Sequence, residues 1–236
     1  SLAKSAAEED SAQAQADATI AGVAFDADGK IVKVIIDTAQ NKVPVTDGVV
    51  EAPEGFKTKK ELGPKYGMKP ASGIDKEWNE QVEFLEEYFV GMTAEEVMGM
   101  EVDEDSYPTN PDFTTAATLK ISSHQQAVLN SWENAVDAEC VETIGLGVYT
   151  NLGHGTKDAD DENGAAVQFE DNIALVGLNA DGEVVASQTD VAQNTVTFTP
   201  DGELDGEYAK GTTKKALGAD YGMKDVSESV GIGKEW

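Results

Sequence analysis

A polar stretch and two short apolar runs open the chain. Residues 4–18 are mostly Ala, Gln, Glu and Asp, which predicts a solvated segment leading into the first strand. The runs Ile20–Phe25 and Ile31–Ile36 lie on either side of Asp28-Gly29. An Asp-Gly pair between apolar runs favours a hairpin, because glycine tolerates the positive φ that a tight turn needs. The pattern therefore predicts a first β-hairpin.

A second pair of apolar runs predicts another hairpin later in the chain. Ile173–Leu178 and Val184–Ala186 flank the dipeptide Asp181-Gly182. Asp-Gly pairs also occur within residues 46–48 and 200–202, and they predict one further turn after each hairpin.

Residues 75–90 carry the clearest helical pattern. Trp78, Val82, Leu85 and Phe89 recur at spacings of three and four, which places them on one face of a helix. Burying four such side chains is worth roughly 6–12 kcal/mol before opposing terms. We therefore interpret this stripe as part of a hydrophobic core and not as a cofactor site.

Capping residues predict three short helices. Thr58 and Thr213 are N-cap candidates for helices that end at Gly63 and Gly218. The segment Thr93-Ala94-Glu95-Glu96 has the spacing of a capping box, in which the cap and the third helical residue bond to each other's backbone amides.

The remaining pattern completes the fold class. Residues 112–121 read as a turn and a strand, and residues 125–138 as a helix with one apolar face. That face comprises Val128, Trp132, Ala135 and Val136. The order of hairpin, helices, strand and helix predicts an α+β fold in which an antiparallel sheet is covered by helices.

An apparent internal duplication organises these elements. Thr58–Lys69 returns as Thr213–Lys224, and Gly73–Trp78 returns as Gly231–Trp236, about 155 residues later. Such a period is that of a whole domain. We predict a duplicated domain, with a first copy at residues 1–140 and a second copy at residues 141–236.

The two copies differ at their outer ends. The first copy has no counterpart of Gly145–Thr150, a candidate first strand of the second copy. The second copy has no counterpart of the helix body Asn79–Val90 or of the segment Asp112–Ala138. We therefore interpret the sequence as a window from a longer repeat protein, in which the second copy is incomplete at its C-terminal side.

The charge balance excludes some partners. The net charge is −28, from 45 acidic and 17 basic residues, and every basic residue is Lys. Duplex DNA and RNA are bound through cationic phosphate contacts, often from Arg, so nucleic acid is not an expected partner. Adhesion to an anionic membrane surface is disfavoured for the same reason. Such charge is typical of a soluble protein in an exposed environment.

One segment carries a recognisable motif. Asp112-Phe113-Thr114-Thr115-Ala116-Ala117-Thr118 resembles the flavinylation site of the FMN-binding domain family, whose pattern is Asp, two variable residues, Ser or Thr, Gly, Ala, then Ser or Thr. Asp112, Thr115, Ala117 and Thr118 match. Ala116 stands where the family has Gly, and the added Cβ could hinder the enzyme that modifies the site.

The resemblance implies a cofactor-binding site at Asp112, Thr115, Ala116, Ala117 and Thr118. In this family the last residue of the motif forms a phosphoester with FMN, which a separate flavin transferase installs. A threonine hydroxyl without an adjacent base is a weak nucleophile, so the chain would be the substrate of that reaction. The resemblance therefore implies a redox carrier and assigns no catalytic residue.

The repeat also resembles tandem domains of clostridial-type surface lipoproteins, over nearly the whole chain. The shared features are the Lys-Lys-x-Leu-Gly-x-x-Tyr-Gly-Met-Lys segment, the Lys-Glu-Trp helix start and the Thr-Ala-Glu-Glu-Val segment. This implies an extracellular, cell-surface location with a lipid anchor outside this chain. The implied partners are a flavin transferase and membrane redox proteins.

Other candidate sites have weaker signals. Tyr66, Met68 and Trp78, with Tyr221, Met223 and Trp236 in the second copy, could stack on a flavin ring, but packing beneath helices is the commoner use of such residues.

No metal site is predicted. The acidic segment 158–164 fits an EF-hand loop poorly, because Ala159 occupies the first ligand position and a strand follows. His124, His154 and Cys140 lack metal-ligand spacing. As the single cysteine, Cys140 cannot form an intrachain disulfide, and it is expected to be a small buried residue.

Two functions remain open at this point. The first is an extracytoplasmic flavin carrier with FMN on Thr118. The second is a surface or binding module that kept the fold and lost the cofactor, as the Ala116 departure and the degraded motifs of the lipoprotein subgroup suggest.

Overall fold

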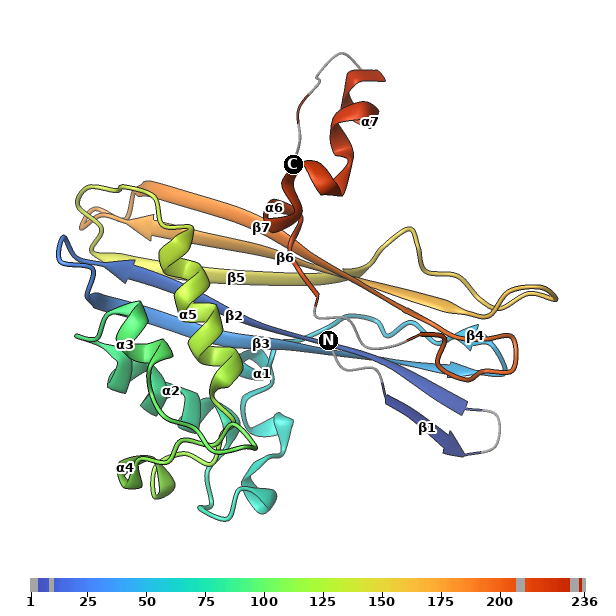
Figure 1. The fold of residues 1–236 in the computed structure, drawn as a ribbon, viewed down its shortest axis with the longest axis horizontal. Coiled ribbons are helices and arrows are strands. Elements are labelled where there is room, and N and C mark those ends of the chain that lie inside the picture. The colour runs from blue at the N-terminus through green and yellow to red at the C-terminus, as the bar shows by residue number, and fades with distance from the viewer. Residues whose placement is uncertain (1–3, 9–10, 207–210, 230–233, 235–236) are drawn as a thin grey trace.

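The computed structural model describes residues 4–8, 11–206, 211–229 and 234. Within these residues the strands form two antiparallel sheets, and helices cover one of them (Figure 1). This confirms the predicted α+β class. No helix in the described part of the chain is long and apolar enough to cross a membrane.

The first sheet contains the predicted first hairpin, and its strands are much longer than expected. Strand β2 (Ser11–Phe25) pairs with β3 (Ile31–Thr46) through the turn at Gly29, whose φ is +76°. The edge strands are β1 (Lys4–Glu8) and β4 (Val49–Val50). The prediction that residues 4–18 form a solvated segment before the first strand is therefore wrong, because β1 and the start of β2 lie within it.

A weak alternation explains that error. Ala14 and Ala16 are fully buried, while the residues between and after them are polar. Alanine contributes little hydrophobic signal, but its small side chain suits a face where two sheets approach closely.

The second sheet contains the second predicted hairpin. Strand β5 (Thr143–Leu152) pairs with β6 (Ala166–Leu178), which pairs with β7 (Val184–Thr197). The register shifts beside the turn at Gly177/Leu178, as it does at Ala24/Phe25 in the first hairpin. The turns predicted at residues 46–48 and 200–202 form, with positive φ at Gly48 and Gly202.

A helical layer covers the first sheet and forms the larger core. Helix α2 (Trp78–Phe89) buries the whole predicted stripe against the sheet, and α3 (Ala94–Met98) begins at the predicted Thr93 capping box. Helix α5 (Ser122–Glu133) packs on β2 and α3, as Figure 1 shows. The buried members of this core are Ile31, Val34, Ile36, Trp78, Val82, Leu85, Phe89, Ala94, Val97, Phe113, Leu119, Ile121 and Val128.

A second core lies between the two sheets. The first sheet contributes small and β-branched side chains, and the second sheet contributes Phe169 and its neighbours. The buried members are Ala14, Ala16, Val43, Val45, Ala165, Val167, Phe169, Val196 and Phe198. The chain thus stacks helices, first sheet and second sheet as three successive layers.

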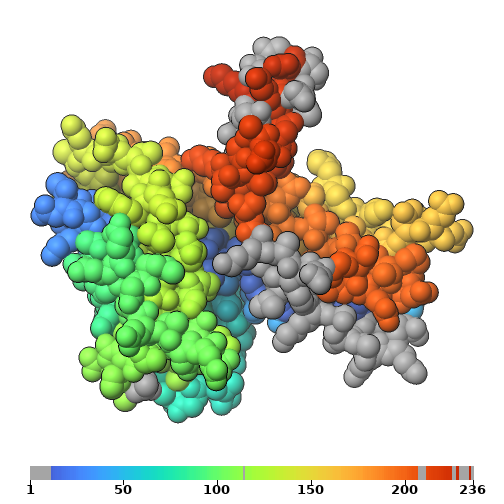
Figure 2. Space-filling model, viewed as in Figure 1, coloured from blue at the N-terminus to red at the C-terminus, as the bar shows by residue number. Residues whose placement is uncertain are grey.

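The short helices predicted at Thr58 and Thr213 are confirmed. These are α1 (Lys59–Leu62) and α6 (Lys214–Leu217), and each is followed by a 3₁₀ turn, η1 (Gly63–Tyr66) and η3 (Gly218–Tyr221). Another 3₁₀ turn, η2 (Lys69–Ala71), precedes α2, and α7 (Met223–Ser229) projects from the two-sheet body (Figures 1 and 2).

Three predictions from the middle of the chain need correction. Residues 112–121 contain the short helix α4 (Pro111–Thr114) and an irregular segment, not a strand. Helix α5 ends at Glu133 and not at residue 138, so Val136 is 55% exposed. Cys140 is exposed and has a positive φ, because it lies in the loop between α5 and β5.

Candidate functional site

The candidate flavinylation motif begins in a helix turn. Asn110 caps α4 by accepting a hydrogen bond from the amide of Asp112, and Pro111 occupies the first helical position. The amides of Ala116 and Ala117 both donate to the carbonyl of Phe113, at 2.9 and 2.7 Å. This cap and Pro111 explain why the segment forms a helical turn although its threonines favour strands.

Thr118 lies against the start of helix α2. Its amide nitrogen donates to Oε1 of Gln81 at 2.7 Å, and its hydroxyl donates to the carbonyl of Ser72 at 3.0 Å. The hydroxyl oxygen is also 3.2 Å from Oε1 of Gln81. Thr118 is half-buried, so its side chain is held by the protein at the boundary with solvent.

Gln81 organises this contact from the buried side. It is fully buried, and its Nε2 donates to the carbonyl of Lys76 at 3.1 Å and lies 3.9 Å from the sulfur of Met68. No sequence pattern predicts this role, because a glutamine beside an apolar stripe is typical of a helix surface. Thr118, whose amide Gln81 accepts, lies 37 residues later in the chain.

The other motif residues divide into two groups. Asp112 and Thr115 are exposed, whereas Ala116 is half-buried and Ala117 is buried. Nζ of Lys76 donates to the carbonyl of Ala116 at 3.2 Å, which places an ammonium group two residues from Thr118. The structure therefore brings Ala116, Ala117 and Thr118 beside α2 and leaves Asp112 and Thr115 facing solvent.

The aromatic residues near this site belong largely to the core. Trp78 is buried, and Tyr66 and Met68 pack against the core from its edge. Nζ of Lys59 lies 4.8 Å from the ring centre of Tyr66 and 5.4 Å from that of Trp78, within the range of cation–π contacts. Trp236 lies outside the described residues.

His124 lies behind Trp78, with ring centres 6.4 Å apart. Its side chain is 5% exposed, and burial lowers its pKa to about 4, with a smaller effect in the same direction from the charge of Lys59. Nδ1 lies 3.1 Å from the carbonyl of Lys120, so the neutral ring donates there. At neutral pH this histidine is therefore an uncharged core residue.

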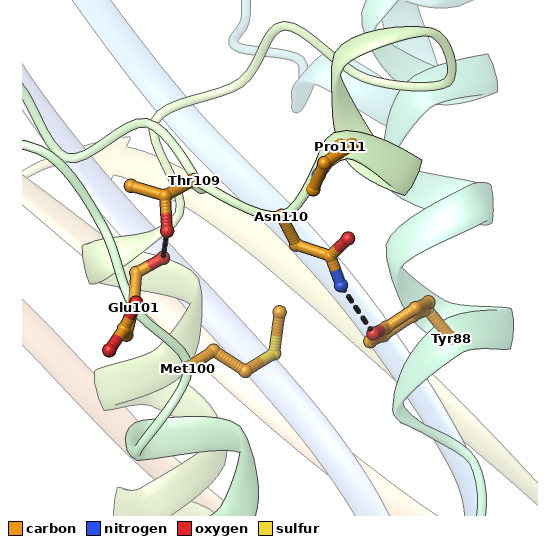
Figure 3. Close-up of a pocket in the computed structure, with 6 residues that line it drawn as sticks. All are labelled: Tyr88, Met100, Glu101, Thr109, Asn110 and Pro111. Atoms are coloured by element: carbon orange, nitrogen blue, oxygen red, sulfur yellow. Dashed lines mark hydrogen bonds between the residues drawn. The ribbon is translucent and has the colours of Figure 1, made fainter.

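Two cavities adjoin these elements. A cavity of about 350 Å³ opens at the start of α4 between Tyr88, Met100 and Asn110, where Nδ2 of Asn110 donates to the hydroxyl of Tyr88 at 3.2 Å (Figure 3). A cleft of about 1370 Å³ runs between α5, β2 and the second sheet. Thr118 lines neither of them.

The acidic loop around Asp160 is closed by its own backbone. Oδ1 of Asp160 accepts hydrogen bonds from the amides of Glu162 and Asn163, and these bonds lower the pKa of the Asp160 carboxyl. Among the described residues, no three His, Cys, Asp or Glu side chains are grouped to hold a metal ion.

Comparison with known proteins gives one partial similarity. A protein of Desulfitobacterium hafniense called chlorophenol reductase is 39% identical to this chain over 94 residues, which cover 34% of this chain. The similar region spans 28% of that protein. No protein-family model matches the chain, and no solved structure matches it.

Proposed function

We propose that this chain is a member of the FMN-binding domain family and acts as a flavin carrier, with FMN esterified to Oγ of Thr118. The observation that carries the proposal is the position of Thr118. The motif ends in a half-buried threonine at the protein surface, with the ammonium group of Lys76 bonded to the carbonyl two residues before it.

The residues around Thr118 fit a phosphoester. Esterification replaces the hydroxyl proton by phosphorus, so the bond from Thr118 to the carbonyl of Ser72 would be given up. The bond from the Thr118 amide to Gln81 does not involve the hydroxyl and would still hold the backbone in place. Lys76 would supply a positive charge for the phosphate.

The bound flavin would supply reversible one- and two-electron transfer. The role of this chain is then to hold the flavin and keep it in solution. A free FMN phosphate would meet an unfavourable field at a protein of charge −28, and a covalent link prevents its loss by dissociation.

Recurring contacts support a duplicated domain. Oδ1 of Asp37 accepts from the amide of Lys60 at 3.1 Å, and Oδ1 of Asp190 accepts from the amide of Lys215 at the same distance. The preceding lysine is also placed alike in the two halves. Nζ of Lys59 lies 4.8 Å from the ring centre of Tyr66, and Nζ of Lys214 lies 5.0 Å from that of Tyr221. We assign residues 1–140 to a first copy and 141–236 to a second.

The physiological setting follows from the resemblance and from composition. We place the protein outside the cytoplasm, at the cell surface, with a lipid anchor outside this chain and membrane redox proteins as electron partners. The strongly acidic composition is compatible with that setting. The partial relative is named as a reductase, which is compatible with a redox role.

Intact-mass measurement after co-expression with a flavin transferase tests the proposal. Wild-type protein should gain the mass of one FMN minus one water. Thr118→Ala should lose this increment, while Thr109→Ala, at an exposed threonine outside the motif, should retain it. If Thr118→Ala keeps the adduct, the assigned site is wrong.

A cofactor-free surface or binding module is the second candidate. It is favoured by Ala116 at the family's glycine position and by the hydrogen bond that the Thr118 hydroxyl already makes to Ser72. Wild-type protein without the mass increment, recovered beside a transferase that modifies a positive-control substrate, would support this alternative.

A further inference from the structure

A buried polar cluster joins the two sheets away from the candidate flavin site. Asp171 on β6 is 0% exposed, and Asn41 on β3 is 1% exposed. Nδ2 of Asn41 donates across the interface to Oδ1 of Asp171 at 2.7 Å, and the hydroxyl of Thr150 on β5 donates to the same oxygen at 2.6 Å. A carboxyl group thus lies inside the contact between the layers.

The cluster contains more acceptors than donors. Oδ2 of Asp171 and Oδ1 of Asn41 are both buried, and neither has a hydrogen-bond partner among the described residues. Both atoms belong to the two groups joined by the 2.7 Å bond. Buried acceptors without partners are unfavourable, because each has lost its water and has gained no donor in return.

A single proton removes this conflict. A carboxylic acid and a primary amide each carry one donor and one acceptor on the same side, so they can form two parallel hydrogen bonds. The first of these, from Asn41 to Asp171, is present. We propose that Asp171 is a neutral carboxylic acid whose Oδ2–H donates to Oδ1 of Asn41. The proton then adds a second hydrogen bond between the two sheets.

The surroundings of Asp171 favour the protonated form. Burial raises the pKa of the Asp171 carboxyl, and the nearby Asp17 carboxylate on β2 raises it further, against the hydrogen bonds from Thr150 and Asn41, which lower it. The strand partners of Asp171 are Thr150 on β5 and Ala192 on β7, neither of which carries a charge. Asp17 is therefore the charged group that acts on this site.

A bound cation is the competing explanation, because Oδ1 of Asp17 is also buried and has no hydrogen-bond partner in the described part of the chain. Three oxygens are fewer than the six to eight that calcium takes. A proton on Asp171 needs no further ligand and satisfies two of the three atoms at once. We therefore favour the proton and make the cation an outcome of the test.

Asp171→Asn tests the proposal because its amide supplies the missing donor at every pH. Folding stability should be compared between wild type and Asp171→Asn by thermal unfolding from about pH 4 to pH 9. The Asp171 pKa is raised in the folded protein, so the proton's stabilisation is present at low pH and is lost as pH rises through the folded pKa.

The midpoint of wild type should therefore fall relative to Asp171→Asn as pH rises, by roughly 2–4 °C, the shift expected for one hydrogen bond in a chain of this size. The control is Asp181→Asn, in an exposed turn, whose difference from wild type should not change with pH in this range. An Asp171→Asn protein that is less stable than wild type at neutral pH would overturn the proposal.

Two measurements on wild type keep the test independent of whether Asp171→Asn folds. The carboxyl carbon of Asp171, followed by NMR, should titrate above the ordinary aspartate range, and titration at or below that range would refute the proposal. Millimolar Ca²⁺ should leave the thermal midpoint of wild type unchanged. A Ca²⁺-dependent rise of that midpoint would assign the cluster to a cation instead.

Discussion

The amide nitrogen of Thr118 donates to Oε1 of Gln81 at 2.7 Å, which ties the candidate modification loop to the buried side of α2. The loop has no regular structure of its own after α4. Its position therefore depends on tertiary contacts, among them this bond, the bond from the Thr118 hydroxyl to the Ser72 carbonyl and the bond from Lys76 to the Ala116 carbonyl.

Gln81→Leu should destabilise the protein by about 2 kcal/mol, because it removes the acceptor of the Thr118 amide and leaves the carbonyl of Lys76 without its donor. Urea unfolding measures the effect. Glu87→Leu makes the same kind of change on the exposed face of α2 and should shift stability by less than about 0.5 kcal/mol. Equal effects of the two substitutions would mean that the Gln81 contacts contribute no stability.

Ala116→Gly should increase the fraction of protein that a flavin transferase modifies, because it restores the family glycine and removes a Cβ two residues from Thr118. Intact mass gives the modified fraction directly. Ala117→Gly is the matched control, since Ala117 is buried in the core and its Cβ cannot obstruct an enzyme from outside. The prediction fails if both variants are modified to the same extent as wild type.

Local patterns predicted the elements of this fold well where one face is strongly apolar. The α2 stripe, the two hairpin turns and the Thr-capped helices depend on residues close together in the chain, and all of them form. The strand through residues 11–18 was missed because its buried face is alanine, which differs little in hydrophobicity from its polar neighbours.

The candidate site was predictable only in part. The motif identified Thr118, but its environment comes from Ser72 and Gln81, 46 and 37 residues earlier in the chain. The contact of Asn41 with Asp171 spans 130 residues and connects the two proposed copies. No periodicity signals such contacts, because they arise only when the layers stack.

Protonation of His124 should make stability depend on pH in the opposite direction from Asp171. The His124 pKa is about 4 in the folded protein, below its ordinary value of 6.5, so the neutral form is favoured by folding. Stability is full above pH 6.5 and falls as pH decreases toward 4, by an amount on the order of 3 kcal/mol.

His124→Gln should flatten that slope, and His154→Gln should leave it unchanged, because His154 is exposed. These are the two histidines of the chain, so their ring protons can be followed directly by NMR. A His124 ring that titrates near pH 6.5 would contradict its burial behind Trp78.

Tyr66→Phe and Tyr221→Phe should have similar effects if the two halves are copies. Each removes one hydrogen bond, from Tyr66 to Gln40 at 3.3 Å or from Tyr221 to Gln193 at 3.2 Å. The expected loss is about 1 kcal/mol in each case. Hydrogen exchange of the adjoining strands, β3 for Tyr66 and β7 for Tyr221, should accelerate locally. If only one of the two variants loses stability, the tyrosine–glutamine bond does not have the same role in the two halves.

Gly164→Ala should be strongly destabilising, by about 2–4 kcal/mol, because a Cβ at this position would overlap the carbonyl oxygen of Phe198. That backbone cannot move without loss elsewhere, since the amide of Phe198 donates to the carbonyl of Ala165 at 2.9 Å and both side chains are buried between the sheets. Gly55→Ala is the control, because a Cβ there meets nothing within 4 Å. Urea unfolding should separate the two variants clearly, and a Gly164→Ala protein as stable as Gly55→Ala would mean that this end of the inter-sheet core is looser than its contacts indicate.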